Sequence, residues 1–334
     1  MNELLKVEHL SVDFSTDQGQ VHAVRDVSFS VYPQEVLGIV GESGSGKSQT
    51  MYSVMGLLAS NGKITTDKIE LNGRRIDEAA YKKHRDYEKT MQKIRGNEMA
   101  MIFQDPMTFL NPVLKIGTQL IEPLKNHTKL STKECKAKAI ELMRQVGIPS
   151  PESRMNQYPY EFSGGMRQRI IIAMALACNP KLIIADEPTT ALDVTIQAQV
   201  LELIQEMKDK TGSSVIMITH DLGVVASLCN RIAIMYGGKI VEIGTDKEIF
   251  YDPKHPYTKG LLQCVNNPED DDKDLQPIPG SPPDLLNPPK GCPFVDRCDK
   301  AMRICKEKMP SVTAFSETHQ CSCWLNELKK REAK

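Results

Sequence analysis

The chain has 334 residues, of which 40% are hydrophobic and 25% are charged. This composition is ordinary for a soluble globular protein, and the length suffices for one large domain or a large one with a small one. A formal net charge of −1 gives no overall attraction for nucleic acid. The longest apolar run, Ile170 to Cys178, is too short to cross a bilayer, and the N-terminus lacks the pattern of a signal peptide. We therefore expect a cytoplasmic protein that reaches a membrane only through a partner.

A phosphate-binding loop follows the first strands. Residues 4–40 alternate apolar and polar in short runs typical of strands, and residues 36–40 predict a buried strand. Residues 41–48 match the pattern G-x-x-x-x-G-K-S, and residues 47–58 predict the helix behind it. Glycines let backbone N–H groups approach phosphate oxygens, where the helix N-terminus adds partial positive charge. The alternative, a glycine- and serine-rich turn with a chance lysine, requires neither flanking element.

This loop supplies the predicted nucleotide contacts. Lys47 would reach the β- and γ-phosphates of the nucleotide, and Ser48 would ligate Mg²⁺. The full set of predicted binding residues is Gly41, Glu42, Ser43, Gly44, Ser45, Gly46, Lys47, Ser48 and Gln49.

The next hundred residues mix strand and helix patterns. Residues 63–71 and 99–103 predict strands. The charged stretch 78–95 predicts a solvated helix in preference to a basic patch, because acidic residues interrupt the basic ones. The pattern is helical from about 116 to 147, and Ser131–Glu134 predicts a capping box at the start of one helix.

The following segment alternates regularly between strands and helices. Residues 182–185, 214–219 and 231–236 predict strands, with helices that begin near Val194 and after Asp221. This alternation predicts an α/β fold with a sheet that is mostly parallel here and carries helices on its faces.

Two segments of this part carry phosphate chemistry. The strand at 182–185 ends in Asp186 and Glu187, where Asp186 would hold Mg²⁺ and Glu187 could polarise an attacking water. The segment 163–165, Ser-Gly-Gly, opens a long apolar helix whose first N–H groups would form a second anion-binding site. The alternative is a plain helix cap in which Ser163 is the N-cap residue.

Together these three segments resemble the ATP-binding cassette (ABC) family of transport ATPases over about residues 4–250. The resemblance implies that Ser163, Gly164 and Gly165 contact the γ-phosphate of an ATP held by the other subunit. The family signature usually reads Leu-Ser-Gly-Gly-Gln, and here Phe162 and Met166 replace its ends. The serine and the glycines that meet phosphate are kept.

Three further positions match the family in the expected order. Gln104 corresponds to a glutamine that contacts Mg²⁺ and links the site to the membrane partner. Asp193 matches a loop that crosses the dimer interface, and His220 matches the histidine at the γ-phosphate. By resemblance, therefore, Glu187 and His220 are the catalytic residues.

The family also implies a fold and a domain division. The expected architecture is a RecA-like mixed sheet core with an antiparallel β part and a helical subdomain at about 112–166, all within residues 1–250. The aromatic residue that stacks on adenine in the family has no firm match. Phe14 is the nearest aromatic, although Gln18 falls closer to the expected spacing.

Residues 251–334 form a separate C-terminal extension by composition. A linker at 266–290 holds seven prolines, and five of the nine cysteines follow within 292–323. Its phrases resemble the C-terminal extension of oligopeptide and dipeptide importer ATPases, parts of which nickel importer subunits share. These phrases are His255-Pro256-Tyr257-Thr258, Ile278-Pro279-Gly280-Ser281-Pro282-Pro283, Gly291-Cys292-Pro293-Phe294 and Arg297-Cys298.

The cysteines of the extension predict a metal centre. Related proteins carry a [4Fe–4S] cluster on four such thiolates, which here would be Cys292, Cys298, Cys305 and Cys323, with Cys321 as a substitute. Zinc remains an alternative by ligand chemistry, although the usual Cys-x₂₋₄-Cys spacing is absent, and free thiols are a third possibility. A reducing cytosol disfavours disulfides.

The predicted function is that of an ATP hydrolase that powers import of oligopeptides across the cytoplasmic membrane. By resemblance, its partners are a paralogous ATP-binding subunit in a heterodimer, two transmembrane permeases and an extracytoplasmic peptide-binding protein, with no nucleic acid. The chain would then act at the cytoplasmic face of the membrane, with ATP, Mg²⁺ and the cluster as its ligands. Cargo is chosen by the other subunits, so a dipeptide or nickel importer remains an alternative.

Other classes fit less well. A DNA-repair ATPase of the superfamily carries a long coiled-coil insertion, and a ribosome-associated cassette protein carries two cassettes. An exporter subunit lacks the extension, and a regulatory module would be expected to lose Glu187 or His220, both of which are present. A redox-sensing or electron-transfer role of the tail is a minor alternative, which a reversible loss of ATPase activity on oxidation would favour.

Overall fold

The computed structural model describes residues 2–105, 109–190, 193–264 and 277–332. The chain divides into two compact units. The first comprises Met1–Leu4, Tyr32–Glu35 and Glu78–Met217, and the second comprises Leu5–Val31, Val36–Asp77 and Ile218–Lys334. The chain passes from the first unit to the second for the last time inside strand β9 (Ser214–Thr219).

An antiparallel sheet begins the second unit. In it, β1 (Leu5–Thr16) pairs with β2 (Gly19–Val31), β4 (Gly62–Thr65) and β5 (Lys68–Leu71), and β5 also pairs with β6 (Arg74–Arg75). The predicted strand 63–71 is therefore two strands. The strands are interrupted at Thr66, which belongs to neither of them. Its hydroxyl donates a hydrogen bond to the carbonyl oxygen of Glu8 at 2.7 Å.

A mixed set of strands forms the rest of the second unit. The fully buried β3 (Val36–Val40) lies parallel to β10 (Arg231–Tyr236), and β11 (Lys239–Thr245) is antiparallel to β10. Two short strands of the extension, β13 (Gln320–Cys321) and β12 (Thr313–Ala314), continue this series beside β11. The mixed sheet expected for the family is thereby confirmed, whereas the sequence did not predict that the extension would add strands to it.

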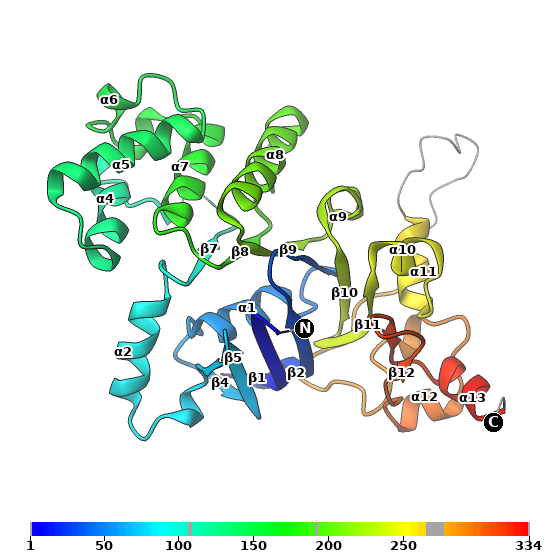
Figure 1. The fold of residues 1–334 in the computed structure, drawn as a ribbon. Helices are drawn as coiled ribbons and strands as arrows, with labels where there is room; N and C mark the ends of the chain where they lie inside the picture. Colours follow the sequence, from blue (N-terminus) through cyan, green and yellow to red (C-terminus); the bar gives the residue numbers. More distant parts are fainter. Residues whose placement is uncertain (1, 106–108, 191–192, 265–276, 333–334) are drawn as a thin grey trace. The chain divides into compact units, whose positions relative to one another are not determined.

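Helices cover these strands. α1 (Lys47–Met55) packs on β1 and β2, α9 (Leu222–Leu228) on β3, and α10 (Asp246–Tyr251) on β10 and β11 (Figure 1). The helix after the phosphate-binding loop is shorter than predicted, because Gly56 adopts a left-handed conformation with φ of 62° and caps it.

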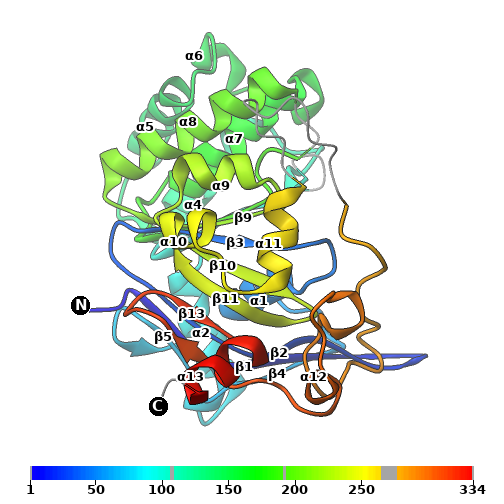
Figure 2. The ribbon, with the colours of Figure 1, turned by 90° about the vertical axis from the view of Figure 1, so that its right-hand side faces the viewer.

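The extension folds largely without regular structure. It contains α11 (Pro256–Gln263), the 3₁₀ turn η3 (Val295–Arg297), α12 (Arg303–Glu307) and α13 (Trp324–Glu332), which are seen from the side in Figure 2. Residues 277–290 form neither helix nor strand, as the proline-rich composition predicts. The rest of the predicted linker as far as residue 276 lies outside the described residues.

The first unit combines two strands with a group of helices. β7 (Met99–Ile102) and β8 (Leu182–Asp186) are parallel, and every residue in them is buried. The helices are η1 (Glu78–Ala80), α2 (His84–Ile94), α4 (Ile116–His127), α5 (Thr132–Gln145), α6 (Pro151–Arg154), η2 (Pro159–Glu161), α7 (Gly164–Leu176) and α8 (Val194–Thr211). α7 packs on β7, and it contacts α4, α5 and α8 (Figure 1).

The predicted capping box of α5 is present. Ser131 Oγ accepts a hydrogen bond from the Glu134 backbone, and Glu134 Oε2 accepts one from the Ser131 backbone at 2.7 Å. In the described parts of the chain, no helix combines the length and the apolar character that a membrane span requires.

Candidate nucleotide-binding site

The phosphate-binding loop owes its shape to two glycines that no other residue could replace. A Cβ on Gly41 would lie 2.1 Å from the carbonyl oxygen of Met235. Gly46 has a φ of 99°, and a Cβ there would lie 2.4 Å from the carbonyl oxygen of Ala23. The chain therefore turns tightly between buried β3 and α1, as the motif predicts.

Lys47 lies folded back onto this loop. Its Nζ donates hydrogen bonds to the carbonyl oxygens of Gly41 at 2.7 Å and Glu42 at 3.0 Å, and the residue is only 5% exposed. A buried ammonium group needs such acceptors, and phosphate oxygens are stronger ones. The Glu42 carbonyl also accepts a hydrogen bond from the Ser45 backbone at 3.2 Å, which closes the turn.

The two predicted acidic residues lie at the end of β8 in different settings. Asp186 is the last residue of the strand and is buried, whereas Glu187 is half-buried in the loop that follows. Glu187 adopts a left-handed backbone with φ of 45°, which is costly for a residue with a side chain. Such a conformation indicates that the position of this carboxylate is constrained.

Gln104 and Glu187 are brought together. Gln104 follows β7 and Glu187 follows the parallel neighbour β8, so both lie beyond the carboxyl ends of adjacent strands. Gln104 Nε2 donates to Glu187 Oε2 at 2.9 Å, and the Thr190 hydroxyl donates to the same oxygen at 2.9 Å. The sequence named Gln104 and Glu187 separately and missed Thr190, whose only signal is its place three residues after the acid.

The signature segment begins α7 as a capped helix. Ser163 Oγ accepts a hydrogen bond from the Met166 backbone at 3.3 Å, which is the N-cap that the alternative predicts. Gly164 has open space where a Cβ would lie. Phe162, which replaces the usual leucine, is 3% exposed and lies under the Arg154 guanidinium at 5.5 Å. An apolar residue at this position is thus explained by burial.

A residue that the sequence did not single out connects the signature helix to the acidic loop. Gln168 is 1% exposed, and its Nε2 donates to the carbonyl oxygen of Pro188 at 2.7 Å. Pro188 immediately follows Glu187. Through this hydrogen bond, a displacement of α7 would also displace the loop that carries Glu187, the predicted base.

The remaining predicted residues have simpler placements. Asp193 is the N-cap of α8 and accepts a hydrogen bond from the Ile196 backbone at 3.0 Å. His220 is exposed directly after β9. Phe14 is half-buried in β1, and Gln18 is exposed in the turn to β2, so the adenine contact stays a prediction.

The predicted magnesium ligands have suitable chemistry. They are the Ser48 hydroxyl, the Gln104 side-chain carbonyl and the Asp186 carboxylate. All three offer oxygen, which Mg²⁺ prefers over nitrogen and sulfur. Asp186 is buried, and a nearby cation would stabilise a carboxylate in that setting.

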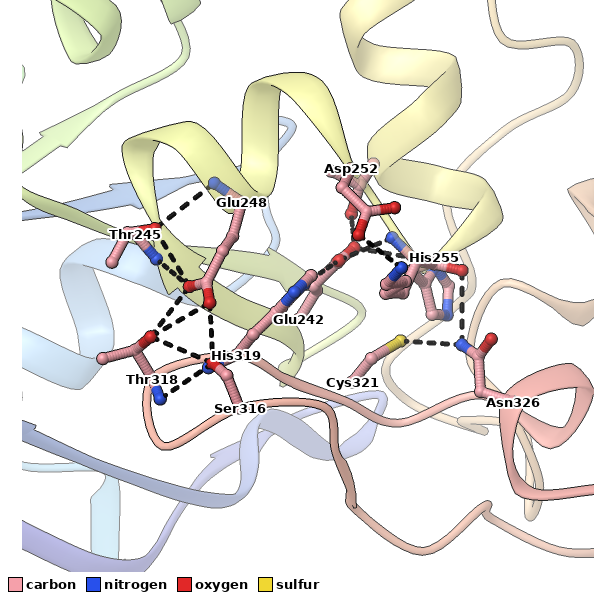
Figure 3. Close-up of polar contacts among 12 residues, drawn as sticks. Glu242, Thr245, Glu248, Asp252, His255, Ser316, Thr318, His319, Cys321 and Asn326 are labelled. Atoms are coloured by element: carbon pink, nitrogen blue, oxygen red, sulfur yellow. Dashed lines mark hydrogen bonds and ion pairs between the residues drawn. The ribbon is translucent and has the colours of Figure 1, made fainter. Parts of the chain in front are cut away.

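A buried polar centre, drawn in Figure 3, joins β11 to the extension. Glu242 on β11 is 1% exposed and accepts hydrogen bonds from His319 Nε2 at 2.7 Å and from the Thr258 hydroxyl at 2.6 Å. The backbone N–H groups of Lys254 and His255 donate to the same carboxylate. Burial raises the pKa of Glu242, but these hydrogen bonds together lower it below its ordinary value. The carboxylate thereby fastens β13 and the start of α11 to β11.

The cysteines of the extension fall into two groups. The four predicted ligands line one cavity, to which His255 and Trp324 also contribute. These ligands are Cys292, Cys298, Cys305 and Cys323. Cys321 does not line that cavity, and its sulfur accepts a hydrogen bond from Asn326 at 3.4 Å (Figure 3). All five are free thiols. Burial raises the pKa of Cys292 to about 12 and also raises that of Cys298 and Cys323.

No set of three or more His, Cys, Asp or Glu side chains in the described part of the chain is arranged to hold a metal ion. The four cysteines are nevertheless the donor set that a [4Fe–4S] cluster takes, one thiolate for each iron. Four thiolates suit either a [4Fe–4S] cluster or zinc, so the identity of a metal centre here stays a prediction.

Comparison with known proteins agrees with these features. A family model for the ABC transporter matches residues 24–190, and one for the oligopeptide/dipeptide transporter C-terminal region matches residues 241–305. The dipeptide transport ATP-binding protein DppD of Bacillus subtilis is 51% identical over 334 residues, covering 100% of this chain and 98% of its own. The oligopeptide transport ATP-binding protein OppD of the same organism is 52% identical over 97% of this chain and 89% of its own.

Solved structures match the cassette part. CbiO1 of Clostridium perfringens, part of the CbiONQ transporter complex, has a TM-score of 0.62 and 26% identity over 75% of this chain and 92% of its own. The cassette MJ0796, solved as a dimer with ADP and phosphate, has a TM-score of 0.62 and 24% identity over 72% of this chain and 98% of its own, and it supports the fold alone. The chain belongs to the ABC transporter family, and within it to the oligopeptide and dipeptide transport ATP-binding proteins.

Proposed function

We propose that this chain is the ATP-hydrolysing subunit that powers a peptide importer, with oligopeptides as its cargo. The observation that carries the proposal is the phosphate-binding loop with Lys47 docked on its own carbonyl oxygens, in a chain that matches peptide transport ATP-binding proteins over its whole length. The loop supplies the ATP site, and the full-length identity supplies the transport role.

The chemistry of hydrolysis follows from residues of this chain. Lys47 exchanges the carbonyl oxygens of Gly41 and Glu42 for the β- and γ-phosphates. Ser48, Gln104 and Asp186 would hold a Mg²⁺, which would neutralise charge on the phosphates. Glu187 orients and deprotonates the attacking water, and the hydrogen bonds from Gln104 and Thr190 fix its carboxylate. His220 donates to the γ-phosphate.

The working unit is a dimer of cassettes. One phosphate-binding loop and one signature occur in the chain, so each ATP lies between residues 41–48 of one subunit and 163–165 of the other. Asp193 lies at the interface. Because the signature contacts the γ-phosphate, ATP stabilises the closed dimer more than ADP does. Hydrolysis removes that contact, the dimer opens, and a permease docked near Gln104 receives the motion.

The remaining assignments extend the same proposal. The cassette domain occupies residues 1–250 with its helical subdomain at about 112–166, and the extension occupies 251–334. The partners are a paralogous ATP-binding subunit, two permeases and an extracytoplasmic binding protein, with this chain at the cytoplasmic face of the membrane. Cys292, Cys298, Cys305 and Cys323 hold a [4Fe–4S] cluster, which is supported by their common cavity.

Dipeptides are the second candidate cargo. The identity to the dipeptide protein of Bacillus subtilis is 51%, against 52% for the oligopeptide protein, so identity does not choose between them. Uptake measured in cells that lack this chain, but retain its transporter partners, distinguishes oligopeptide from dipeptide cargo. Loss of labelled tetrapeptide uptake that the intact gene restores supports oligopeptides. Loss confined to a dipeptide, or to Ni²⁺, would overturn that cargo.

A further inference from the structure

Glu42, the second residue of the phosphate-binding loop, is held at all three of its polar groups. Its backbone N–H donates to the Tyr257 hydroxyl at 3.1 Å, and its carboxylate accepts from Arg297 at 2.7 Å. Its carbonyl oxygen accepts from Lys47 at 3.0 Å and from the Ser45 backbone at 3.2 Å. The extension therefore binds the N–H group and the carboxylate of Glu42, while the carbonyl oxygen binds Lys47, the predicted phosphate ligand.

The Arg297 side chain is buried and is held by several hydrogen bonds besides the one to Glu42. The arginine side chain is 6% exposed, and the Glu42 side chain is 26% exposed. The guanidinium also donates to the carbonyl oxygens of Ile278 and Pro279 and to the Tyr236 hydroxyl. It lies 5.7 Å from the centre of the Tyr236 ring. Contacts on every side fix the position of the guanidinium, so the carboxylate of Glu42 meets a rigid partner.

We propose that Arg297 is a positioning residue for the phosphate-binding loop. By fixing Glu42, it holds the carbonyl oxygen on which Lys47 docks, and it thereby sets the conformation in which the loop receives ATP. The inference rests on the proposed function in one respect, which is that the loop binds ATP. It assigns to the extension a direct part in nucleotide binding.

The same turn also reaches the cysteine cavity. Arg297 ends η3, and its neighbours Val295 and Cys298 line the cavity. Arg297 and Cys298 are consecutive residues, so the turn that positions Arg297 also forms one wall of the cavity.

A double-mutant cycle in the assembled transporter tests this proposal. The variants are Arg297→Gln, Glu42→Gln and the combination, with Arg297→Lys as the conservative change. Glu42→Gln is the sharper variant, because it removes the ion pair and leaves the contacts of Arg297 to residues 278 and 279 in place. Fluorescence of Trp324, the only tryptophan of the chain, shows whether the extension stays folded.

The expected result is a KM for ATP that rises about tenfold in each single variant, the size expected for a charged hydrogen bond. The rise in KM should exceed the fall in kcat, the double variant should be no worse than either single one, and Arg297→Lys should recover only part of the loss. A normal KM in Glu42→Gln, or additive effects in the double variant, would overturn the inference. A transporter that fails to hydrolyse ATP before any substitution would instead overturn the proposed function, and the inference with it.

Discussion

The side-chain amide of Gln104 donates a hydrogen bond to Glu187 at 2.9 Å, across the ends of two neighbouring parallel strands. This contact joins the residue predicted to face the membrane partner to the residue predicted to activate water. A second donor, the Thr190 hydroxyl, binds the same carboxylate oxygen. A movement of Gln104 would therefore be expected to reorient the Glu187 carboxylate, which is the coupling that the proposed function requires between a permease and hydrolysis.

Glu187→Gln should abolish turnover while ATP binding survives. The substitution keeps the shape of the side chain but removes the carboxylate that takes a proton from water, and general bases contribute about 10²–10⁴-fold to rate. ATP hydrolysis by the assembled transporter and equilibrium ATP binding should be measured together. The matched control is Thr190→Val, which removes one hydrogen bond to the base and should lower kcat far less. Normal turnover in Glu187→Gln would show that another group is the base.

Lys47→Ala should weaken ATP binding about tenfold or more, because the triphosphate loses a charged hydrogen-bond donor. The substitution also removes the two hydrogen bonds from Lys47 to the carbonyl oxygens of Gly41 and Glu42. Binding of a fluorescent ATP analogue to the full chain measures the effect. Lys63→Ala, at an exposed lysine on β4, is the control and should bind normally. Equal affinities in the two variants would contradict the role of the loop.

Substitution of a cysteine that lines the cavity should abolish cluster binding, whereas substitution of Cys321 should not. Cys298→Ser or Cys305→Ser removes a proposed cluster ligand, so protein purified without oxygen should lose iron, sulfide and visible absorbance. Cys321→Ser should retain all three, because that sulfur does not line the cavity. Stoichiometric zinc in place of iron would rule out the cluster and would support a structural zinc site.

Acid should loosen the extension through Glu248. Burial acts to raise its pKa, but hydrogen bonds from Ser316, Thr318 and Thr245 lower it to about 2 from an ordinary value of 4.5 (Figure 3). Since the folded pKa lies below the unfolded one, this stabilisation is complete above about 4.5 and is lost as the pH falls towards 2.

Urea unfolding followed by Trp324 fluorescence measures that dependence. Glu248→Gln should flatten the change in unfolding free energy between pH 4.5 and 2, because the titrating group is gone. Glu317→Gln, at an exposed carboxylate in the same segment, should leave it intact. An unchanged acid profile in Glu248→Gln would mean that its hydrogen bonds do not stabilise the fold.

The nucleotide loop could be predicted from the sequence because its motif is a short, contiguous pattern of residues. Gly41 and Gly46 are required by backbone contacts, and the motif encodes them. The ion pair of Arg297 with Glu42 joins residues 255 positions apart, so no local pattern reveals it. Strand β13 was missed for the same reason, since two residues pair only after the extension has folded onto β11.

Peptide uptake that depends on hydrolysis tests the central claim most directly. Cells lacking this chain should be restored with the intact gene or with the Lys47→Ala gene, and uptake of a labelled tetrapeptide should be compared at equal amounts of the chain in the membrane. The account predicts full uptake with the intact gene and none above background with Lys47→Ala. Equal uptake in both would contradict the claim that ATP turnover by this chain drives peptide import.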